Sequence, residues 1–200
     1  HEIILVSSGA IAMGAGKLSM TSRPHDTPTK QAAASIGQCE LMYTYNKEFA
    51  EYNHTVAQIL LTVLDLQDEE HRKNFENTMA RLLELGALPV INENESVATE
   101  ELEIDNDTMG ALVAEAVGAE LLILLSDIDG LYTADPHKDP FARLIHDVCA
   151  LTPEITALGG GEGSALGTGG MAAKLKAAEI AVRAGIDMVN ANGAHPAVLY

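Results

Sequence analysis

The amino-acid sequence predicts an α/β protein with a doubly wound, open and mainly parallel sheet and helices on both faces, in three α/β/α layers. Short and nearly continuous apolar runs alternate with longer helical patterns, which is typical of strands buried on both faces. A glycine directly follows several predicted helices, and glycine supplies the left-handed turn that ends a helix. Polar motifs come directly after apolar runs, and ligands of parallel sheets bind beyond the carboxyl ends of the strands.

The predicted strands are short runs of aliphatic and β-branched residues. In chain order they cover residues 3–6, 56–61, 88–92, 121–126, 144–148 and 187–190. The predicted helices between them carry apolar residues at helical spacing or begin with a capping residue. They cover residues 10–17, 29–52, 67–85, 107–117, a short helix that begins at 152–154, and 171–184. Residues 19–28 are rich in Ser, Thr, Pro and Asp, so they are predicted to form a loop.

The composition excludes several classes of protein. The 200 residues include 12 Lys and Arg against 29 Asp and Glu, which gives a formal net charge of −17. Hydrophobic residues make up 47% of the chain, which is too many for a disordered protein. Because binding to phosphates needs clustered Lys and Arg, no nucleic-acid partner is expected. No apolar run approaches the ~18 residues that span a bilayer, so no membrane partner is expected either.

The cysteines, the histidines and the first residues of the chain give weaker indications. Cys39 and Cys149 lie far apart, and we expect both to be small buried hydrophobes. Two lone thiols fit a reducing, cytoplasmic interior. The seven His have no metal-binding spacing, so no metal site made of protein ligands is predicted. The chain has neither a signal peptide nor an initiator Met, and we expect it to be a fragment.

Two glycine-containing turns are candidates for binding an anion. Residues 7–14 run from a strand through a turn into a helix, where backbone N–H groups bind anions; an ordinary tight turn is the alternative. Residues 166–174 end a glycine-rich stretch and place Lys174 one turn inside a helix, which suits a polyphosphate. A surface loop with a solvated lysine is the alternative there. The P-loop pattern fails because residue 18 is Leu, and the dinucleotide pattern fails because no strand precedes residue 167.

Two polar segments follow predicted strands and are candidates for substrate binding. Between Glu93 and Asp107 lie seven carboxylates, these two included, and no Lys or Arg. Such a segment can bind a substrate or Mg²⁺, or it can be a solvated face in which Asp105 or Asn106 caps the next helix. Residues 126–136 follow the most apolar strand, where a polar turn can bind a base or a ribose. A turn built from Asp and Gly for local reasons is the alternative.

Taken in this order, the segments resemble the amino acid kinase family, and in particular the branch that phosphorylates glutamate. The matching stretches are VSSGAIAMG (6–14), KQAAASIGQ (30–38), PVINENESVA (89–98), DND (105–107), LLSDIDGLYTADP (124–136), ALGTGGMAAK (165–174) and RAGID (183–187). They extend over essentially the whole chain. The GTGGM…K stretch and the Ser-Asp strand end are shared by the wider family, whereas SSGAIA, INEN…VA and DND indicate the glutamate branch.

The resemblance implies a doubly wound open sheet and a reaction that uses ATP and Mg²⁺. The γ-phosphoryl group of ATP would pass to the side-chain carboxylate of L-glutamate, giving γ-glutamyl phosphate in the first step of proline biosynthesis. A glutamate carboxylate, with a pKa of about 4.3, is already a nucleophile at pH 7, so no general base is required. The chain's lack of a catalytic pattern around His or Cys is consistent with such chemistry.

The resemblance also implies roles for individual residues. Ser8, Glu95 and Asn106 would contact glutamate, and Asp107 would hold the catalytic lysines in place. Lys174 would neutralise charge on the transferred phosphoryl group. The residues expected to bind the nucleotide are Ser126, Asp127, Thr168, Gly169, Gly170, Met171, Ala172, Ala173 and Lys174. The family often has Asp where this chain has Glu95.

On the same grounds, residues 1–200 are expected to be one amino acid kinase domain without its first strand and helix, its last strand, or an RNA-binding or reductase domain. One of the two phosphate-facing lysines of the family would then precede His1, so the chain alone is expected to be inactive or nearly so. The family also implies a homo-oligomer and inhibition by proline. The alternatives are another acceptor (aspartate, N-acetylglutamate, carbamate or a nucleoside monophosphate) and a non-catalytic amino-acid sensor.

Overall fold

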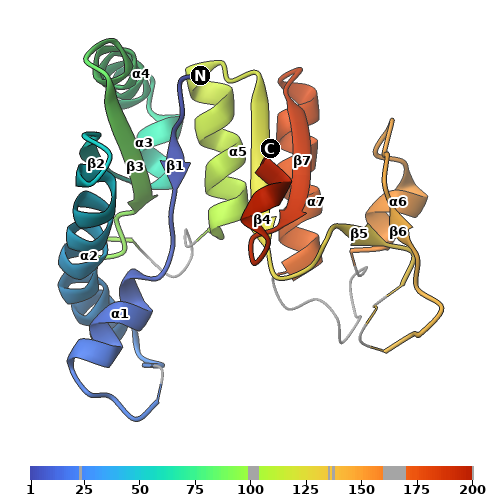
Figure 1. The fold of residues 1–200 in the computed structure, drawn as a ribbon, viewed down its shortest axis with the longest axis horizontal. Coiled ribbons are helices and arrows are strands. Elements are labelled where there is room, and N and C mark those ends of the chain that lie inside the picture. The colour runs from blue at the N-terminus through green and yellow to red at the C-terminus, as the bar shows by residue number, and fades with distance from the viewer. Residues whose placement is uncertain (23, 99–103, 135, 137, 160–169, 200) are drawn as a thin grey trace. The chain divides into compact units, whose positions relative to one another are not determined.

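The computed structural model describes residues 1–22, 24–98, 104–134, 136, 138–159 and 170–199. The chain divides into two compact units, His1–Met109 and Gly110–Tyr200 (Figure 1). Each unit contains strands that pair in parallel and helices that pack on them. The predicted α/β class with parallel strands is therefore confirmed.

The first unit is built on a three-stranded parallel sheet with the strand order β1-β3-β2. Its strands are β1 (Leu5–Val6), β3 (Ala87–Glu93) and β2 (Thr55–Leu61). Val90 and Ile91 of the central strand β3 are fully buried, as its continuous apolar run predicts. The register pairs Val6 with Ile91 and Leu61 with Glu93, so the three strands end at the same edge of the sheet.

Two helices of the first unit cross with no room for side chains at the crossing. They are α1 (Ala10–Lys17) and α2 (Thr27–Ala50). A Cβ added to Gly37 would lie 1.8 Å from the backbone oxygen of Ala10, and one added to Gly14 would lie 1.8 Å from that of Ala33. The glycines therefore let the two backbones touch, which brings the start of α1 against the middle of α2.

Helix α2 begins earlier than the sequence predicts. Asp26 caps it, accepting hydrogen bonds from the backbone N–H (3.0 Å) and the hydroxyl (2.7 Å) of Thr29. These hydrogen bonds hold the pKa of Asp26 below its ordinary value. Pro28 lies in the first turn, where its missing N–H costs no helical hydrogen bond. The predicted loop over residues 19–28 was therefore too long, because its last residues form the cap and the first turn.

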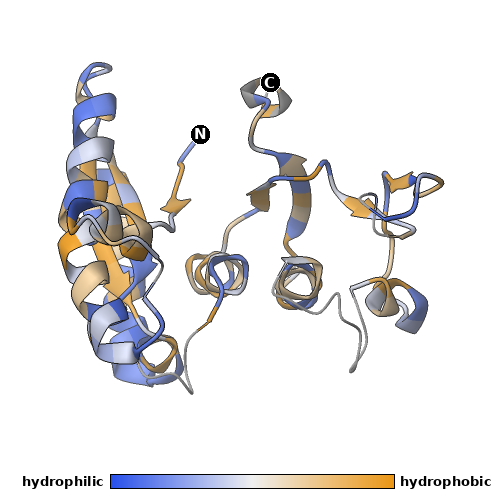
Figure 2. Ribbon diagram, turned by 90° about the horizontal axis from the view of Figure 1, so that it is seen from below, coloured by the Kyte–Doolittle hydropathy of each residue, from blue (hydrophilic) through white to orange (hydrophobic). Residues whose placement is uncertain are grey.

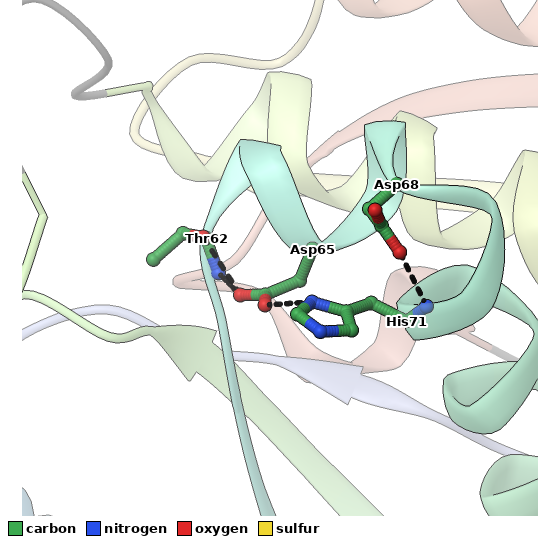
Figure 3. A network of polar contacts seen from close by, with 4 residues as sticks. All are labelled: Thr62, Asp65, Asp68 and His71. Atoms are coloured by element: carbon green, nitrogen blue, oxygen red, sulfur yellow. Dashed lines mark hydrogen bonds and ion pairs between the residues drawn. The ribbon is translucent and has the colours of Figure 1, made fainter.

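Two helices occupy the region of the helix predicted over residues 67–85, and the first of them, which lies almost entirely before residue 67, was not predicted. They are α3 (Val63–Gln67) and α4 (Glu69–Glu84). Asp65 accepts hydrogen bonds from the backbone N–H and the hydroxyl of Thr62, both at 2.7 Å, and its other oxygen lies 3.1 Å from Nδ1 of His71 (Figure 3). Asp68 accepts a hydrogen bond of 2.9 Å from the backbone N–H of His71. Asp68 therefore starts a second helix where the first one ends.

Asp65→Asn is expected to destabilise the first unit near pH 7 and to matter less in acid. Partial burial raises the pKa of Asp65, but hydrogen bonds from Thr62 and then His71 outweigh it, so the pKa lies below its ordinary value. The charged form of Asp65 thus stabilises the fold above its unfolded pKa of about 3.9, and this contribution is lost as the pH falls through the lower folded pKa. Urea unfolding of the wild-type protein and the Asp65→Asn variant at neutral and at strongly acidic pH measures the difference in their free energies of unfolding. An equal difference at the two pH values would contradict the expectation.

The second unit packs two helices on a pair of parallel strands. It contains most of α5 (Asn106–Val117), β4 (Leu121–Ser126), α7 (Gly170–Arg183) and β7 (Asp187–Asn192). Its core joins Ala111 of α5, Leu124 of β4 and Ala177 of α7, all buried. Alanines at these contacts let both helices approach the strands closely. Strand β4 is hydrophobic except for Ser126, whereas three of the six residues of β7 are polar, and the colours of Figure 2 distinguish the two kinds of residue.

The remaining elements of the second unit are short. They are β5 (Leu131–Tyr132), β6 (Leu144–Ile145), α6 (Pro153–Ala157) and the 3-10 helix η1 (Pro196–Leu199). Strand β5 was not predicted, and the strand predicted over residues 144–148 forms only its first part, because β5 offers just two partners for antiparallel pairing. The predicted start of α6 is confirmed, with the hydroxyl of Thr152 accepting a 3.4 Å hydrogen bond from the N–H of Ile155.

Two observations concern the surface of the chain. Both cysteines are exposed, so the expectation that they are buried hydrophobes was wrong. Cys39 lies on α2, and Cys149 lies in a segment without regular structure. Among the residues that the structure describes, no helix is long and apolar enough to cross a membrane.

Candidate functional site

The polar residues after β1 and β3 come together because these strands end at the same edge of the first sheet. The backbone N–H of Ser7 donates to the oxygen of Ile91 at 2.8 Å, which extends the pairing of β1 with β3. The N–H of Asn94 donates to the oxygen of Leu61 at 2.7 Å, which ties the end of β3 to β2. The turn that starts at residue 7 and the INENES segment (91–96) therefore lie at one edge of the sheet, as the sequence predicts.

A pocket of about 200 Å³ opens at this edge. Three segments form its walls: the middle of α2, the end of β2 and the turn that follows β3. The lining residues are Ala10, Ala34, Ser35, Gln38, Cys39, Gln58, Leu60, Glu93, Asn94, Glu95 and Ser96. Glu95, a predicted substrate residue, is thus a wall of the pocket. Ser8 is exposed in the turn before α1 and is not among the lining residues.

The turn before α1 depends on Gly9. Its φ of 102° lies in the left-handed region that other residues rarely adopt, and its oxygen accepts the first helical hydrogen bond, 2.9 Å from the N–H of Met13. The hydroxyl of Ser7 is hydrogen-bonded to that of Tyr45 on α2 at 2.8 Å. The backbone after β1 is therefore fixed both by its own helix and by α2.

Helix α2 also holds the turn that follows β3. The hydroxyls of Ser35 and Ser96 lie 2.8 Å apart in a hydrogen bond, and Nε2 of Gln31 donates to the oxygen of Ala98 at 3.1 Å. Within the turn, the oxygen of Asn94 accepts hydrogen bonds from the two N–H groups of residues 97 and 98. These contacts set the position of Glu95 relative to the pocket.

Three side-chain amides, two of which line the pocket, are joined in a row by hydrogen bonds. Nδ2 of Asn92 donates to Oε1 of Gln38 at 3.0 Å, and Nε2 of Gln38 donates to Oε1 of Gln58 at 3.2 Å. Sequence reasoning assigned no role to Gln38 or Gln58. The stretch KQAAASIGQ was a match to the family and ends at Gln38, but the match gave no indication of what the side chain does.

The start of α5 separates the two interpretations of the DND motif. The N–H and the hydroxyl of Thr108 donate to the two carboxylate oxygens of Asp105, both at 2.8 Å. Asp105 therefore caps the helix, as the structural alternative predicted. Asn106 and Asp107 lie half-buried in the first turn of the helix, where exposed N–H groups and the helix dipole favour anions.

In the second unit, the end of β4 forms a local turn. The hydroxyl of Ser126 accepts a 3.1 Å hydrogen bond from the N–H of Ile128 and donates one of 3.1 Å to the backbone oxygen of the same residue. Nδ2 of Asn192 donates to Asp129 at 3.0 Å, and the hydroxyl of Tyr132 donates to Asp129 at 3.3 Å. Burial and the Asp129 carboxylate raise the pKa of Tyr132. Part of the predicted nucleotide motif therefore stabilises its own turn, while Asp127 is exposed.

Helix α7 carries the described part of the predicted phosphate site. The helix starts at Gly170, and Ala173 is buried while Lys174 is half-buried. Met171 and Ala172 lie in the same first turn. Thr168 and Gly169 lie outside the residues that the structure describes. Lys174 is therefore one turn inside a helix, as the sequence predicts.

The predicted residues fall in both units of the chain. The first unit holds Ser8, Glu95, Asn106 and Asp107, and the second holds Ser126, Asp127 and the described residues of 168–174. Within the described ranges, no group of three or more His, Cys, Asp or Glu residues could hold a metal ion. The substrate residues and the nucleotide residues are thus separate sets along the chain.

Solved structures share the fold at low sequence identity. Carbamate kinase from Giardia lamblia bound to AMP-PNP matches with a TM-score of 0.62 at 17% identity, over 100% of this chain and 80% of that one. Aspartokinase III from E. coli, in complex with aspartate and ADP, matches with a TM-score of 0.61 at 17% identity, over 94% of this chain and 42% of that one. Isopentenyl phosphate kinase matches with a TM-score of 0.61 over 98% of this chain and 77% of its own.

Sequence comparison is more specific. Residues 1–192 match the model of the amino acid kinase family. The glutamate 5-kinase of Clostridium perfringens is 47% identical over 99% of this chain and 76% of its own length, and that of Clostridium tetani is 50% identical over 100% and 75%. The glutamate 5-kinase of Listeria monocytogenes is 49% identical over 100% and 74%. The chain therefore belongs to the amino acid kinase family and, within it, to the glutamate 5-kinases.

Proposed function

We propose that the enzyme to which this chain belongs catalyses the ATP-dependent phosphorylation of the side-chain carboxylate of L-glutamate, the first step of proline biosynthesis. The observation that carries the proposal is the identity of 47% to 50% with glutamate 5-kinases over essentially the whole chain. A pocket of about 200 Å³, whose lining includes Gln38, Gln58 and Glu95, also lies at the sheet edge where the expected substrate motifs meet.

The reaction needs positioning and charge stabilisation more than proton transfer. An oxygen of the glutamate carboxylate attacks the γ-phosphorus of ATP, and the bond from that phosphorus to the β–γ bridging oxygen breaks. The products are γ-glutamyl phosphate and ADP. Because the carboxylate is ionised at pH 7, the protein supplies orientation and positive charge instead of a general base.

The substrate residues keep the roles that the family resemblance implies. Glu95, in the pocket wall, faces the substrate ammonium, and Ser8 and Asn106 contact glutamate. The position of Asn106 in the first turn of α5 supports its role, because helix N-termini favour anions such as a carboxylate. Asp107 positions the lysines that face the phosphoryl group.

The nucleotide would be held by the second unit. Ser126 and Asp127 follow β4, and residues 168–174 lead into α7, whose N-terminus and Lys174 suit phosphate. We propose that Mg²⁺ enters with ATP, since Mg²⁺ is usually bound by one or two carboxylates together with substrate phosphates.

Three further properties of the family are proposed for this chain. They are assembly as a homo-oligomer, inhibition by proline and a cytoplasmic location. Each is open to a direct measurement: the mass of the protein in solution, glutamate turnover in the presence of proline, and fractionation of the cells that make it.

A panel of acceptors tests the proposed function. The enzyme, expressed from its whole reading frame, is expected to release ADP from ATP with L-glutamate and not with aspartate, N-acetylglutamate, carbamate or a nucleoside monophosphate. ADP release with one of the others but not with glutamate would overturn the assignment. Binding of glutamate without any ADP release would instead support the amino-acid sensor.

A further inference from the structure

The direction of one buried amide is fixed by the backbone of β3. Asn92 is 1% exposed, and its Oδ1 accepts a 2.9 Å hydrogen bond from the N–H of Glu93. Since an N–H can be accepted only by oxygen, the carboxamide has a single orientation. Its Nδ2 must then face α2, where it donates to Oε1 of Gln38.

The orientation of Asn92 also fixes the orientation of the Gln38 carboxamide. Its oxygen is engaged by Asn92, so its Nε2 is the group that faces β2 and donates to Oε1 of Gln58. Gln58 in turn has its oxygen turned toward Gln38, so its Nε2 is the donor that its carboxamide offers to a ligand. The three carboxamides therefore form a relay with one direction, from the backbone of β3 to the pocket wall on β2.

The relay gives the pocket two walls of different chemistry. Gln38 and Gln58 line one side, and their fixed orientation makes that side a donor of N–H groups. Glu93 and Glu95 line the side formed by the end of β3 and its turn. Donors suit a carboxylate and acidic groups suit an ammonium, and an α-amino acid carries both.

We propose that Gln58 binds a carboxylate of the amino-acid substrate through Nε2, and that Gln38 is the positioning residue that turns Gln58 in this direction. The identity of the substrate rests on the proposed function, whereas the relay rests on the geometry alone. Gln38 acts without touching the substrate carboxylate, and its effect requires the side chain of Gln58.

Gln→Glu substitutions test the relay. Gln58→Glu keeps an oxygen for Gln38 but replaces the donor by a negative charge, so the KM for glutamate is expected to rise by about 10-fold or more. The kcat and the KM for ATP are expected to change by less than about 2-fold. Gln67→Glu is the matched control, because Gln67 is exposed at the end of α3 and does not line the pocket.

The role of Gln38 is tested in combination. Gln38→Glu still accepts from Asn92 but cannot donate to Gln58, so it is expected to raise the KM for glutamate as well. If Gln38 acts through Gln58, adding Gln38→Glu to Gln58→Glu raises the KM little further. If the two substitutions instead raise the KM independently, so that their effects multiply in the double variant, the relay is overturned. The relay is also overturned if the enzyme phosphorylates glutamate and Gln58→Glu leaves its KM unchanged.

Alkylation of the cysteines gives a readout without phosphoryl transfer. Cys39 lines the pocket, and Cys149 is exposed in the other unit, so it is an internal reference. Glutamate is expected to slow the reaction of Cys39 with N-ethylmaleimide but not the reaction of Cys149. The Gln58→Glu enzyme is expected to need about 10-fold more glutamate for the same protection of Cys39. Equal protection in wild type and variant would contradict the relay, whereas no protection and no turnover with glutamate would contradict the proposed function instead.

Discussion

Replacing Lys174 with Ala is expected to lower kcat for glutamate phosphorylation by about 10²–10³-fold. Lys174 lies one turn inside α7, after the glycine-rich segment, where an ammonium and the helix N-terminus can both face phosphate. Its charge would offset the negative charge that spreads over the transferred phosphoryl group in the transition state. Steady-state ADP release at saturating ATP and glutamate measures the effect.

Lys176→Ala is the matched control for this prediction. Lys176 is an exposed lysine on the same helix, two residues further on, so its loss removes the same charge from α7 on another face. We expect this variant to keep nearly full turnover. A Lys174→Ala enzyme that turns over as fast as the Lys176→Ala enzyme would refute a role for Lys174 in phosphoryl transfer.

Gly37→Ala is expected to destabilise the first unit by about 1–3 kcal/mol. The new Cβ would lie 1.8 Å from the backbone oxygen of Ala10, and backbone atoms cannot rotate away, so α1 and α2 must move apart. The move would also displace Gln38, the next residue, and the turn at Gly9. Urea unfolding measures the lost stability, and glutamate binding is expected to weaken as well.

Gly16→Ala provides the comparison within the same pair of helices. A Cβ at Gly16 would meet no atom within 4 Å, so the substitution is expected to be neutral or to stabilise α1 by at most about 1 kcal/mol. Equal effects of the two substitutions would mean that helix propensity, and not the crossing of the backbones, determines the result.

The sequence predicts the central elements of the fold well because their causes are local or strongly patterned. Strand β3 begins with an apolar run, and the burial of Val90 and Ile91 follows from that run, whereas the burial of Asn92 and Glu93 does not. The division between α3 and α4 could not be read from periodicity, because Asp68 both ends one helix and caps the next. Strand β5 was missed because its two residues pair only with a distant partner, β6.

The site was predictable only in part. Glu95 could be assigned to a substrate site from its motif, and it lines the pocket. The amides of Gln38 and Gln58 could not, because their role depends on which neighbour each oxygen accepts from, and these partners come from three different elements. The acidic segment illustrates the same limit, since one of its carboxylates, Asp105, is used as a helix cap.

The central claim is that the enzyme makes an acyl phosphate on the side chain of glutamate. Hydroxylamine converts acyl phosphates into hydroxamates, so mass spectrometry of a reaction with ATP, Mg²⁺, L-glutamate and hydroxylamine identifies the product directly. We expect γ-glutamyl hydroxamate to form in equal amount to ADP. ADP without the hydroxamate, or a hydroxamate formed from another acceptor only, would contradict the claim.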